Sequence, residues 1–464
     1  MDLNADLGLE NWSACAVLPG PWRDPAAAAA PFAEEPWTMA LLSDGSRTGR
    51  WSYLLRRPAA ELWVEPSGGR DPFQTAAARL GPRQASVEGG PPFQGGVAGL
   101  FVYEAGLARE PSVGAARSAD WPDAAAALYP ALLAFDHREG RVLALGRGAD
   151  AEEAQARAAE ALSWLDRPAT AEPVHGALAS DFAPVGSGEA YETVVAEVVA
   201  KIAAGEIFQA NAARTWAGRL ARGAAPFDLF VRLARTSPAP FSAYLRLPGR
   251  AVVSNSPERF IKVDADGRAE TRPIKGTRPR GATPEADAAL AAELAASAKD
   301  QAENLMIVDL MRNDLARACR PGTVRVPELF RLERFANVHH LVSTVTGELS
   351  PGEDALDLLG CAFPPGSITG APKVQAMRVI AGCEPPRGPY CGSIAWAGFD
   401  GALDSSVLIR TAALVQEPGG RWRFEVRAGA GIVADSDPRA ENEETEAKVA
   451  ALRRALTEPL PSFR

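Results

Sequence analysis

The first 145 residues constrain the fold most, because short apolar segments alternate there with turn residues and no helical period recurs. Glycine and proline together make up about a sixth of the chain. Such a pattern is typical of β-strands joined by turns. The longest apolar stretch, 124–135, contains Pro130 and is well short of the ~20 residues that a membrane helix needs. We expect a β-rich N-terminal domain at 1–145 and no membrane span.

A change of composition marks the next boundary. Residues 150–165 are rich in Ala, Glu and Arg, which favours a solvated helix, and 166–187 are rich in Pro, Ala, Gly and Ser. We expect a helix and linker at 146–186, a larger domain at 187–455 and a C-terminal tail at 456–464. A length of 464 residues allows two or three domains.

The larger domain opens with a well-marked helix. Ser187 is a suitable N-cap, an apolar stripe runs from Tyr191 to Ile202, and Gly205 follows as a stop signal. A strand is expected at 207–212. Its period of two places Phe208, Ala210 and Ala212 on one face and Gln209 and Asn211 on the other. A half-exposed strand and a pair of functional amides explain this pattern equally well.

Two acidic pairs occur on predicted helices. Asp300 and Glu303 are three residues apart, and Glu441 and Glu444 repeat this spacing near the C-terminus. Each pair lies on one helix face. If the four carboxylates converge, a hard cation such as Mg²⁺ must lie between them, because the charges otherwise repel. A solvated face is the alternative, and no sequence rule makes the two helices meet.

Three segments combine glycine with polar or basic residues. Residues 363–373 end in Thr369, Gly370 and Lys373 but lack the order of a phosphate loop. Residues 428–433 would let a ligand approach the backbone. Residues 271–281 hold four cations, among them Lys275, which is flanked by Ile274 and Gly276. A desolvated lysine loses its proton and becomes a nucleophile.

Two further side chains are candidates for proton transfer. Glu258 follows an expected strand at 251–254, where a general acid is well placed. His340 is one of four histidines, although a single histidine is more often a core residue.

Net charge, cysteine content and the N-terminal sequence limit the binding partners, metal sites and location that we expect for this chain. The net charge is −9 and basic residues form no runs, which argues against nucleic acid. Five scattered cysteines show no CxxC spacing, which indicates reduced thiols and no zinc site. The N-terminus lacks the basic and apolar regions of a secretory signal, and we therefore expect a cytoplasmic location.

Nine motifs follow one another along the chain, namely QANAARTW, SPERF, PIKGTRPRG, AENLMIVDLMRNDLAR, VHHLVSTVTG, FPPGSITGAPK, YCGSI, LIRTA and GAGIVADSDPRAENEET. In this order they give the chain a strong resemblance to the chorismate-utilising enzymes, the group that includes the synthase components of aminodeoxychorismate and anthranilate synthases. The resemblance is strongest over 187–455 and implies an α+β fold of stacked antiparallel β-sheets flanked by helices, with a chorismate-binding catalytic domain.

Membership implies a Mg²⁺ ion held against a carboxylate of chorismate by Glu303 and Glu444, with Asp300 and Glu441 in support. It also implies a set of substrate-binding residues, in which Arg410, Tyr390 and the 429–431 backbone would hold the second carboxylate. The full set is Gln209, Thr277, Thr369, Gly370, Lys373, Tyr390, Arg410, Gly429, Ala430 and Gly431.

The resemblance also indicates the nucleophile. Members that add water carry a lysine base at the position of Gln209, and a glutamine takes no proton near pH 7. Members that form 4-amino-4-deoxychorismate typically read P-I-K-G-T, as 273–277 do, whereas anthranilate-forming members usually have alanine in place of Lys275. By this reading Lys275 attacks ring carbon 2, and Glu258, aided by His340, protonates the departing hydroxyl. A closed, mostly apolar site would raise the pKa of Glu258 and lower that of Lys275.

The implied function is that of a synthase component which converts chorismate and ammonia to 4-amino-4-deoxychorismate, a transaminase-class reaction on the route to p-aminobenzoate and folate. No cysteine lies in a G-x-C-x-G motif, so a separate glutaminase subunit is expected to supply the ammonia. Anthranilate synthesis is the first alternative. A non-catalytic protein that binds chorismate or tryptophan is the second.

Overall fold

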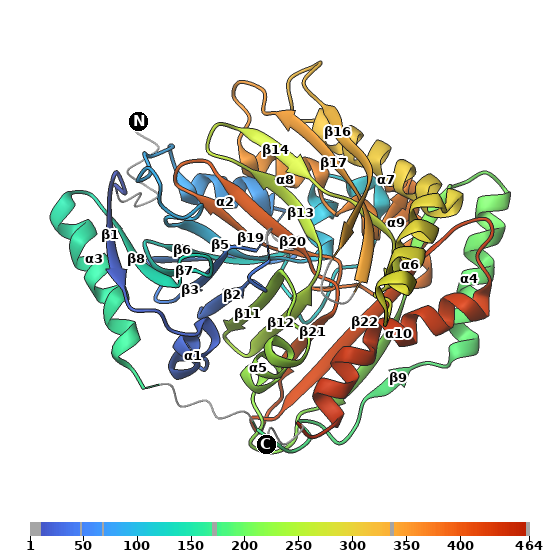
Figure 1. The fold of residues 1–464 in the computed structure, drawn as a ribbon, viewed down its shortest axis with the longest axis horizontal. Helices are drawn as coiled ribbons and strands as arrows, with labels where there is room; N and C mark the ends of the chain where they lie inside the picture. The colour runs from blue at the N-terminus through green and yellow to red at the C-terminus, as the bar shows by residue number, and fades with distance from the viewer. Residues whose placement is uncertain (1–10, 47–48, 67–68, 169–173, 335–337, 461–464) are drawn as a thin grey trace.

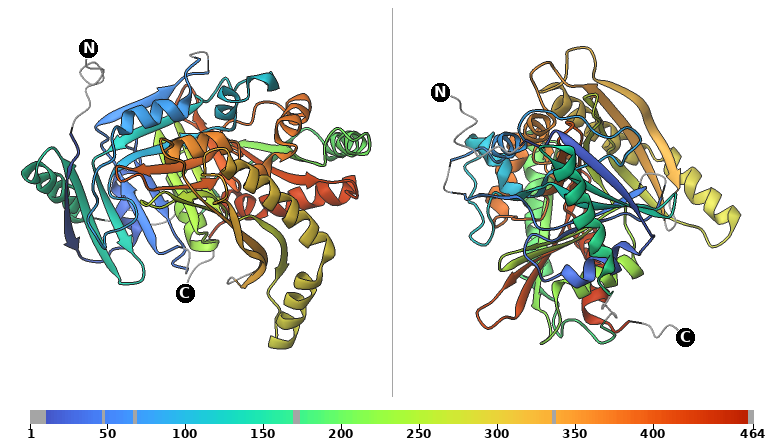
Figure 2. Two further views of the ribbon diagram at one scale, coloured as in Figure 1. Left: turned by 90° about the horizontal axis from the view of Figure 1, so that it is seen from above. Right: turned by 90° about the vertical axis from the view of Figure 1, so that its left-hand side faces the viewer.

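The computed structural model describes residues 11–46, 49–66, 69–168, 174–334 and 338–460, and Figures 1 and 2 show its architecture. Two large antiparallel sheets dominate this part of the chain. The first has 12 strands, in the order β1 (Ala14–Gly20), β8 (Arg141–Gly148), β7 (Ala131–Asp136), β3 (Trp51–Leu55), β2 (Met39–Leu42), β11 (Phe241–Leu247), β12 (Arg250–Ser256), β21 (Thr411–Gln416), β22 (Trp422–Ile432), β10 (Gln209–Arg219) and β18 (Gly370–Ala371), with β9 (Ala183–Val185) also paired to β10.

The second sheet has 10 strands in the described residues. Their order is β15 (Ile274–Pro279), β17 (Val338–Glu348), β14 (Arg268–Thr271), β13 (Arg259–Val263), β20 (Leu403–Val407), β19 (Ser393–Gly398), β5 (Gly96–Phe101), β6 (Ala124–Tyr129) and β4 (Ala60–Val64), with β16 (Arg325–Arg334) also paired to β17.

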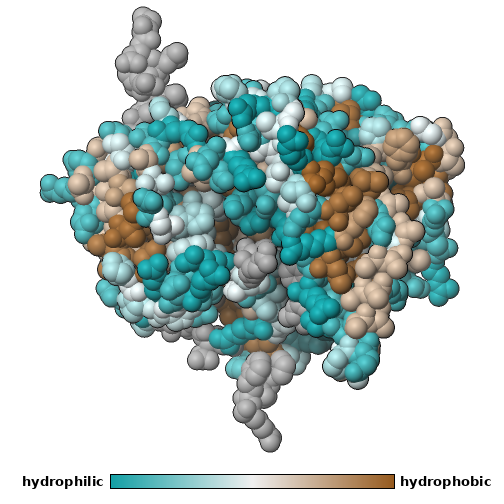
Figure 3. All heavy atoms as spheres, turned by 45° about the horizontal axis from the view of Figure 1, so that its top comes forward, coloured by the Kyte–Doolittle hydropathy of each residue, from teal (hydrophilic) through white to brown (hydrophobic). Residues whose placement is uncertain are grey.

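Helices cover the outer faces of the sheets (Figure 1). They are α1 (Pro25–Ala29), α2 (Pro72–Leu80), α3 (Ala151–Ser163), α4 (Gly188–Ala203), α5 (Pro226–Thr236), α6 (Pro284–Ala296), α7 (Ala298–Ala316), α8 (Ala355–Ala362), α9 (Lys373–Cys383) and α10 (Pro438–Thr457). None of those in the described residues combines the length and the apolar character that a membrane crossing needs. On the face drawn in Figure 3, hydrophilic residues predominate and hydrophobic ones form separate patches.

One part of the core lies between the two sheets. Met39 and Leu245 of the first sheet pack there with Leu100 and Trp396 of the second, and all four are buried. Because each sheet has one face against the other and helices on its outer face, strands are apolar on both faces, as in β6, where every residue is buried. The predicted α+β fold of stacked antiparallel sheets is confirmed.

Strands from the N-terminal and C-terminal parts of the chain share both sheets. β2 pairs with β11 in the first sheet, and β5 pairs with β19 in the second. The described residues of 1–145 therefore contribute strands to both sheets, and none of these strands forms a separate sheet. Sequence composition does not indicate this, because pairing joins strands hundreds of residues apart. The predicted tail at 456–464 begins inside α10, and its last residues, 461–464, lie outside the described part, as do 169–173 of the predicted linker.

The helices predicted at 150–165 and after Ser187 are confirmed. Asp150 and Ser187 are their N-caps, each accepting a hydrogen bond from a backbone N–H of the first turn. The strand expected at 207–212 begins later, at Gln209, where pairing with β18 starts. Phe208 was placed with Ala210 and Ala212 by periodicity, and this is wrong, because Phe208 precedes the strand and is 70% exposed.

Candidate active site

A cavity with a volume of about 1310 Å³ opens between the two sheets, and we call it the central cavity. Strands β15 and β17 and helix α7 contribute one part of its wall, and strand β22 and helix α10 contribute another. Most of the residues predicted from the sequence line it, although they come from distant parts of the chain. They are Glu258, Lys275, Thr277, Asp300, Glu303, His340, Tyr390, Arg410, Gly429, Gly431, Glu441 and Glu444.

Lys275 lies on β15 and points toward the backbone of Gly431. A Cβ atom at Gly431 would lie 3.3 Å from Lys275 Nζ and 2.7 Å from Gln209 Nε2. Because glycine has no Cβ atom, the Lys275 and Gln209 side chains can both approach the strand at this position. Burial lowers the pKa of Lys275, and the neighbouring Lys448 lowers it further. The charges of Glu303, Glu258 and Glu444 oppose these two effects, but within the described residues Lys275 makes no hydrogen bond or ion pair.

Glu258 follows β12 and accepts a hydrogen bond from Ser367 Oγ at 2.7 Å from its Oε1. Burial raises the pKa of Glu258, and the hydrogen bond from Ser367 and the charge of Lys275 oppose this rise. The directions for Glu258 and Lys275 are those predicted for a carboxyl and an amine that both begin a reaction in their neutral forms.

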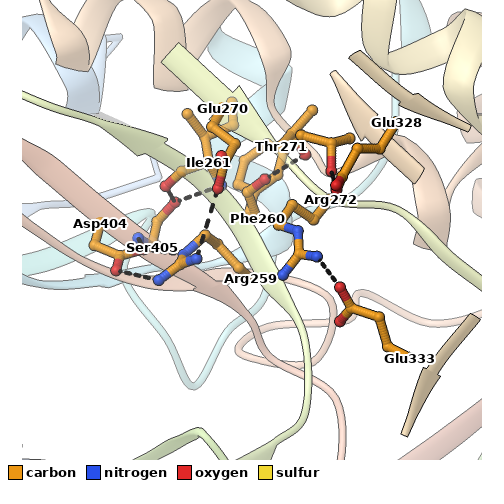
Figure 4. A network of polar contacts seen from close by, with 11 residues as sticks. Arg259, Phe260, Ile261, Glu270, Thr271, Arg272, Glu328, Glu333, Asp404 and Ser405 are labelled. Carbon is orange, nitrogen blue, oxygen red and sulfur yellow. Dashed lines mark hydrogen bonds and ion pairs between the residues drawn. The ribbon is translucent and has the colours of Figure 1, made fainter. Parts of the chain in front are cut away.

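A polar network fixes the chain segments that carry Glu258 and Lys275 (Figure 4). Arg259 pairs with Asp404 at 2.9 Å (Nε to Oδ1) and lies 3.9 Å from Glu270. Thr271 Oγ1 donates to the carbonyl of Phe260 at 2.7 Å, and Arg272 pairs with Glu333. These bonds join β13 to β14 and β20, in the segment that directly follows Glu258 and leads to β15 with Lys275.

His340 lies opposite Thr277 in the β15 and β17 pairing, and its Nδ1 is 2.8 Å from Thr277 Oγ1. Burial lowers the pKa of His340 to about 4, with a further contribution from Arg410. The imidazole is therefore neutral near pH 7. Because a neutral imidazole is a very weak acid, His340 in this state is a poor general acid for a leaving hydroxyl.

The four predicted carboxylates line the cavity, but each has a partner in the protein. Glu444 lies 2.6 Å from Lys448 and Glu303 lies 3.9 Å from Lys299. Asp300 pairs with Arg278 at 3.2 Å, and Glu441 accepts a hydrogen bond from Ser436 at 2.7 Å. Among the described residues no group of three or more metal-ligating side chains is found.

Four of the remaining predicted residues do not line the cavity, namely Thr369, Gly370, Lys373 and Ala430. Lys373 Nζ is 2.7 Å from an oxygen of Asp314 and 2.5 Å from the carbonyl of Ala362, so its ammonium cannot reach a substrate. Thr369 Oγ1 donates to the carbonyl of Pro365 at 3.1 Å. Thr369 and Lys373 of this motif therefore bond within the protein, whereas Ser367 of the same motif lines the cavity.

Gly370 and Ala430 also face away from the cavity. Gly370 pairs with Ala210 in the sheet, and a side chain there would strike the carbonyl of Gln209. Ala430 packs on the opposite face of β22 from Gly429 and Gly431, because side chains alternate along a strand.

Gln209 is only 1% exposed, and neither its amide nitrogen nor its amide oxygen has a hydrogen-bond partner. A buried amide of this kind is costly unless a ligand or water satisfies it. Asn211, two residues further on the same face of β10, also leaves its Oδ1 unpaired and lines the cavity. The period-two pattern of this strand correctly grouped the two amides.

Sequence reasoning missed two residues that hold the site together. Ser367 was read as part of the loop motif, but its bond to Glu258 joins positions 109 residues apart. Lys448 Nζ donates to the carbonyl of Gly429 at 2.8 Å while it pairs with Glu444. Its place four residues after Glu444 on a predicted helix was a signal for this pair.

The chain is similar to known proteins in sequence and in fold. The profile of the family described as chorismate binding enzyme matches residues 40–454. Aminodeoxychorismate synthase component 1 of Klebsiella aerogenes is 40% identical over 455 residues, which cover 94% of this chain and 97% of the relative. Anthranilate synthase component 1 of Streptomyces coelicolor is 41% identical and covers 88% and 81%.

Among solved structures, anthranilate synthase component I of Streptococcus pneumoniae has a TM-score of 0.76 at 29% identity and covers 89% of this chain and 93% of its own. The chain therefore belongs to the chorismate-binding enzyme family. The resemblance found in the sequence motifs is confirmed.

Proposed function

We propose that the chain is the synthase component of an aminodeoxychorismate synthase and replaces the C4 hydroxyl of chorismate by an amino group. The observation that carries this proposal is Lys275, an amine of lowered pKa in the central cavity with no fixed partner. The similarity to relatives named aminodeoxychorismate synthase component 1 supports it. An exchange of hydroxyl for amino groups belongs to the transaminase class.

The chemistry proceeds in two displacements. The neutral Lys275 amine attacks ring carbon 2, the double bonds shift, and the C4 hydroxyl leaves as water with the proton of Glu258. Ammonia then adds at C4, the double bonds shift back, and the Lys275 nitrogen leaves carbon 2. Glu258, now a carboxylate, takes up the proton that ammonia releases.

Arg410 and Tyr390 line the same cavity, and the backbone of Gly429 and Gly431 is open to it. A guanidinium, a phenol and exposed backbone groups suit a carboxylate of the substrate. Asn211 Oδ1, which lacks a partner, would accept a hydrogen bond from a substrate hydroxyl.

Glu303 and Glu444 fit a magnesium ion, because both offer hard oxygen ligands to the cavity and Mg²⁺ is commonly held by one or two carboxylates together with water and substrate. The ion would neutralise a substrate carboxylate. We expect Mg²⁺ to raise the melting temperature of the wild-type protein and Glu303→Gln and Glu444→Gln each to abolish this rise. A Glu443→Gln variant, next to Glu444 but outside the cavity lining, should retain it.

Ammonia is scarce near neutral pH, so we propose a glutaminase subunit as the partner. The relatives' designation as component 1 supports a second component. The purified chain should use an ammonium salt but not glutamine, and addition of such a subunit should make glutamine a substrate.

The experiment that tests the function is a product assay with chorismate, Mg²⁺ and ammonium salt. Aminodeoxychorismate is detected after addition of a lyase that releases p-aminobenzoate, whereas anthranilate fluoresces directly. The 41% identity to an anthranilate synthase makes that product the second candidate. Anthranilate as the main product would overturn the proposal, and binding of chorismate without turnover would indicate a non-catalytic protein.

A further inference from the structure

Arg387 is fully enclosed behind the wall of the central cavity, with 2% of its surface exposed. Its Nη1 donates to the carbonyl of Ile368 at 3.0 Å, and its Nη2 donates to the carbonyl of Asn211 at 2.6 Å. Nε and Nη2 also bind the two carboxylate oxygens of Glu384, both at 3.0 Å. The planar fork of an arginine suits such a set of fixed acceptors, and a lysine cannot reproduce it.

Two of these acceptors, Ile368 and Asn211, belong to residues that line the cavity, and the third, Glu384, binds the strand that carries Asn211. Ile368 follows Ser367, which donates to Glu258. Asn211 presents its unpaired amide to the cavity. Glu384 Oε1 additionally accepts from the backbone N–H of Ala213 at 2.7 Å, so the same ion pair binds β10 twice.

The backbone around Arg387 is fixed as well. Its own N–H and that of Gly388 donate to the buried carboxylate of Glu104 at 2.6 and 3.0 Å. The guanidinium lies 4.9 Å from the ring of Tyr103 and 5.6 Å from that of Tyr390. Tyr390 lines the cavity three residues further along the chain.

We propose that Arg387 is a positioning residue of the active site, which sets the relative places of Ser367, Asn211 and Tyr390 by bonding the three chain segments that carry them. It touches no substrate. It acts on catalysis by fixing the Ser367 hydroxyl, which bonds Glu258, and by fixing Asn211 and Tyr390, which line the cavity. This inference rests on the proposed use of the central cavity for chorismate, but it does not depend on which amino isomer is produced.

Arg232 provides a matched control in the same chain. It is also 2% exposed, and its fork donates to four backbone carbonyls, those of Ala455, Glu458, Val174 and Gly176, at 2.5 to 2.9 Å. None of these acceptors lines the central cavity. Each arginine side chain thus makes four hydrogen bonds, which a substitution by lysine disrupts, but only Arg387 lies behind the active site.

The test is steady-state consumption of chorismate by the full chain with ammonium salt, well below the melting temperature of each variant. We expect both substitutions to lower the melting temperature. Arg387→Lys should also lower kcat/KM for chorismate by about 10²-fold, with kcat reduced and KM raised. The reason is that the bonds to the carbonyls of Ile368 and Asn211, worth about tenfold each, are lost. Arg232→Lys should keep kcat and KM within about twofold of wild type.

The proposal is overturned if folded Arg387→Lys retains wild-type kcat and KM, or if both variants lose activity equally. If Arg387→Lys does not fold, Glu384→Gln replaces it, since it removes one charged acceptor of the same fork, and unchanged kinetics in that variant also overturn the proposal. Because consumption of chorismate is measured, an anthranilate product would refute the proposed function while leaving this test valid.

Discussion

Buried lysine and glutamate side chains occur both on the wall of the central cavity and in the layer directly behind it, but they differ in their bonding partners. Lys275 and Glu258 on the wall have no opposite charge bonded to them in the described residues. Lys373 and Glu104 in the layer behind are each fully engaged, Lys373 with Asp314 and Glu104 with two backbone N–H groups. Burial shifts the pKa of all four toward the neutral form.

Burial alone therefore does not distinguish a reactive group from a structural one. The difference is the fixed partner: a lysine bonded to a carboxylate stabilises a loop, whereas a lysine without one is free to bond to a substrate. Five substitutions at these four residues test this comparison.

The largest effect is expected at Lys275. Lys275→Ala should reduce ammonia-dependent formation of aminodeoxychorismate by about 10⁴-fold or more, because the covalent step is lost. The lyase-coupled assay measures this rate, and mass spectrometry of wild-type protein quenched during turnover should find a substrate-derived adduct on Lys275. A variant that made the same product at full rate would remove the nucleophile role.

A loss of stability is expected when Lys373 is changed. Lys373→Met leaves the Asp314 carboxylate buried without its cation, which should cost about 3–5 kcal/mol in the free energy of unfolding. Lys275→Met should cost almost nothing, since no ion pair is broken there. Urea unfolding of the two variants compares them directly, and equal losses would contradict the distinction between the two lysines.

Glu258→Gln should lower kcat by about 10²- to 10³-fold, because the leaving hydroxyl loses its acid. The free energy of unfolding should not fall, since the amide still accepts the hydrogen bond from Ser367. In the wild-type protein the raised pKa of Glu258 keeps the acid protonated to higher pH than a free glutamate. The alkaline limb of the kcat profile should accordingly be absent from the residual activity of the variant.

The smallest effect concerns Glu104. Burial raises its pKa to about 7, against 4.5 for an ordinary glutamate. Between these values the folded protein holds a proton that the unfolded chain has lost, so this group makes stability fall as pH rises through the window and adds no slope above it. The total is at most about 3 kcal/mol. Urea unfolding at pH 5 and pH 7 should differ less in Glu104→Gln than in wild type.

An unchanged difference between pH 5 and pH 7 in Glu104→Gln would assign the slope to another buried acid. Asp314 is the candidate, because burial raises its pKa to about 6, which lies between pH 5 and pH 7.

Local signals in the sequence determined the elements of the site. The N-cap at Ser187 fixes the start of α4, and the acidic pairs fall on α7 and α10 as their spacing predicted. Alternation along β10 placed Gln209 and Asn211 together. The family also followed from the motifs, because each motif is read along the chain without knowledge of its neighbours in space.

Tertiary structure alone decided which motif residues face the cavity. Lys373 lies in a motif as distinctive as that of Lys275, but its carboxylate partner is 59 residues away on α7. Ser367 meets Glu258 across 109 residues, and Arg387 reaches Asn211 across 176. The physical reason is that periodicity reports the orientation of a side chain relative to its own helix or strand, whereas burial and partners depend on how the two sheets pair and pack.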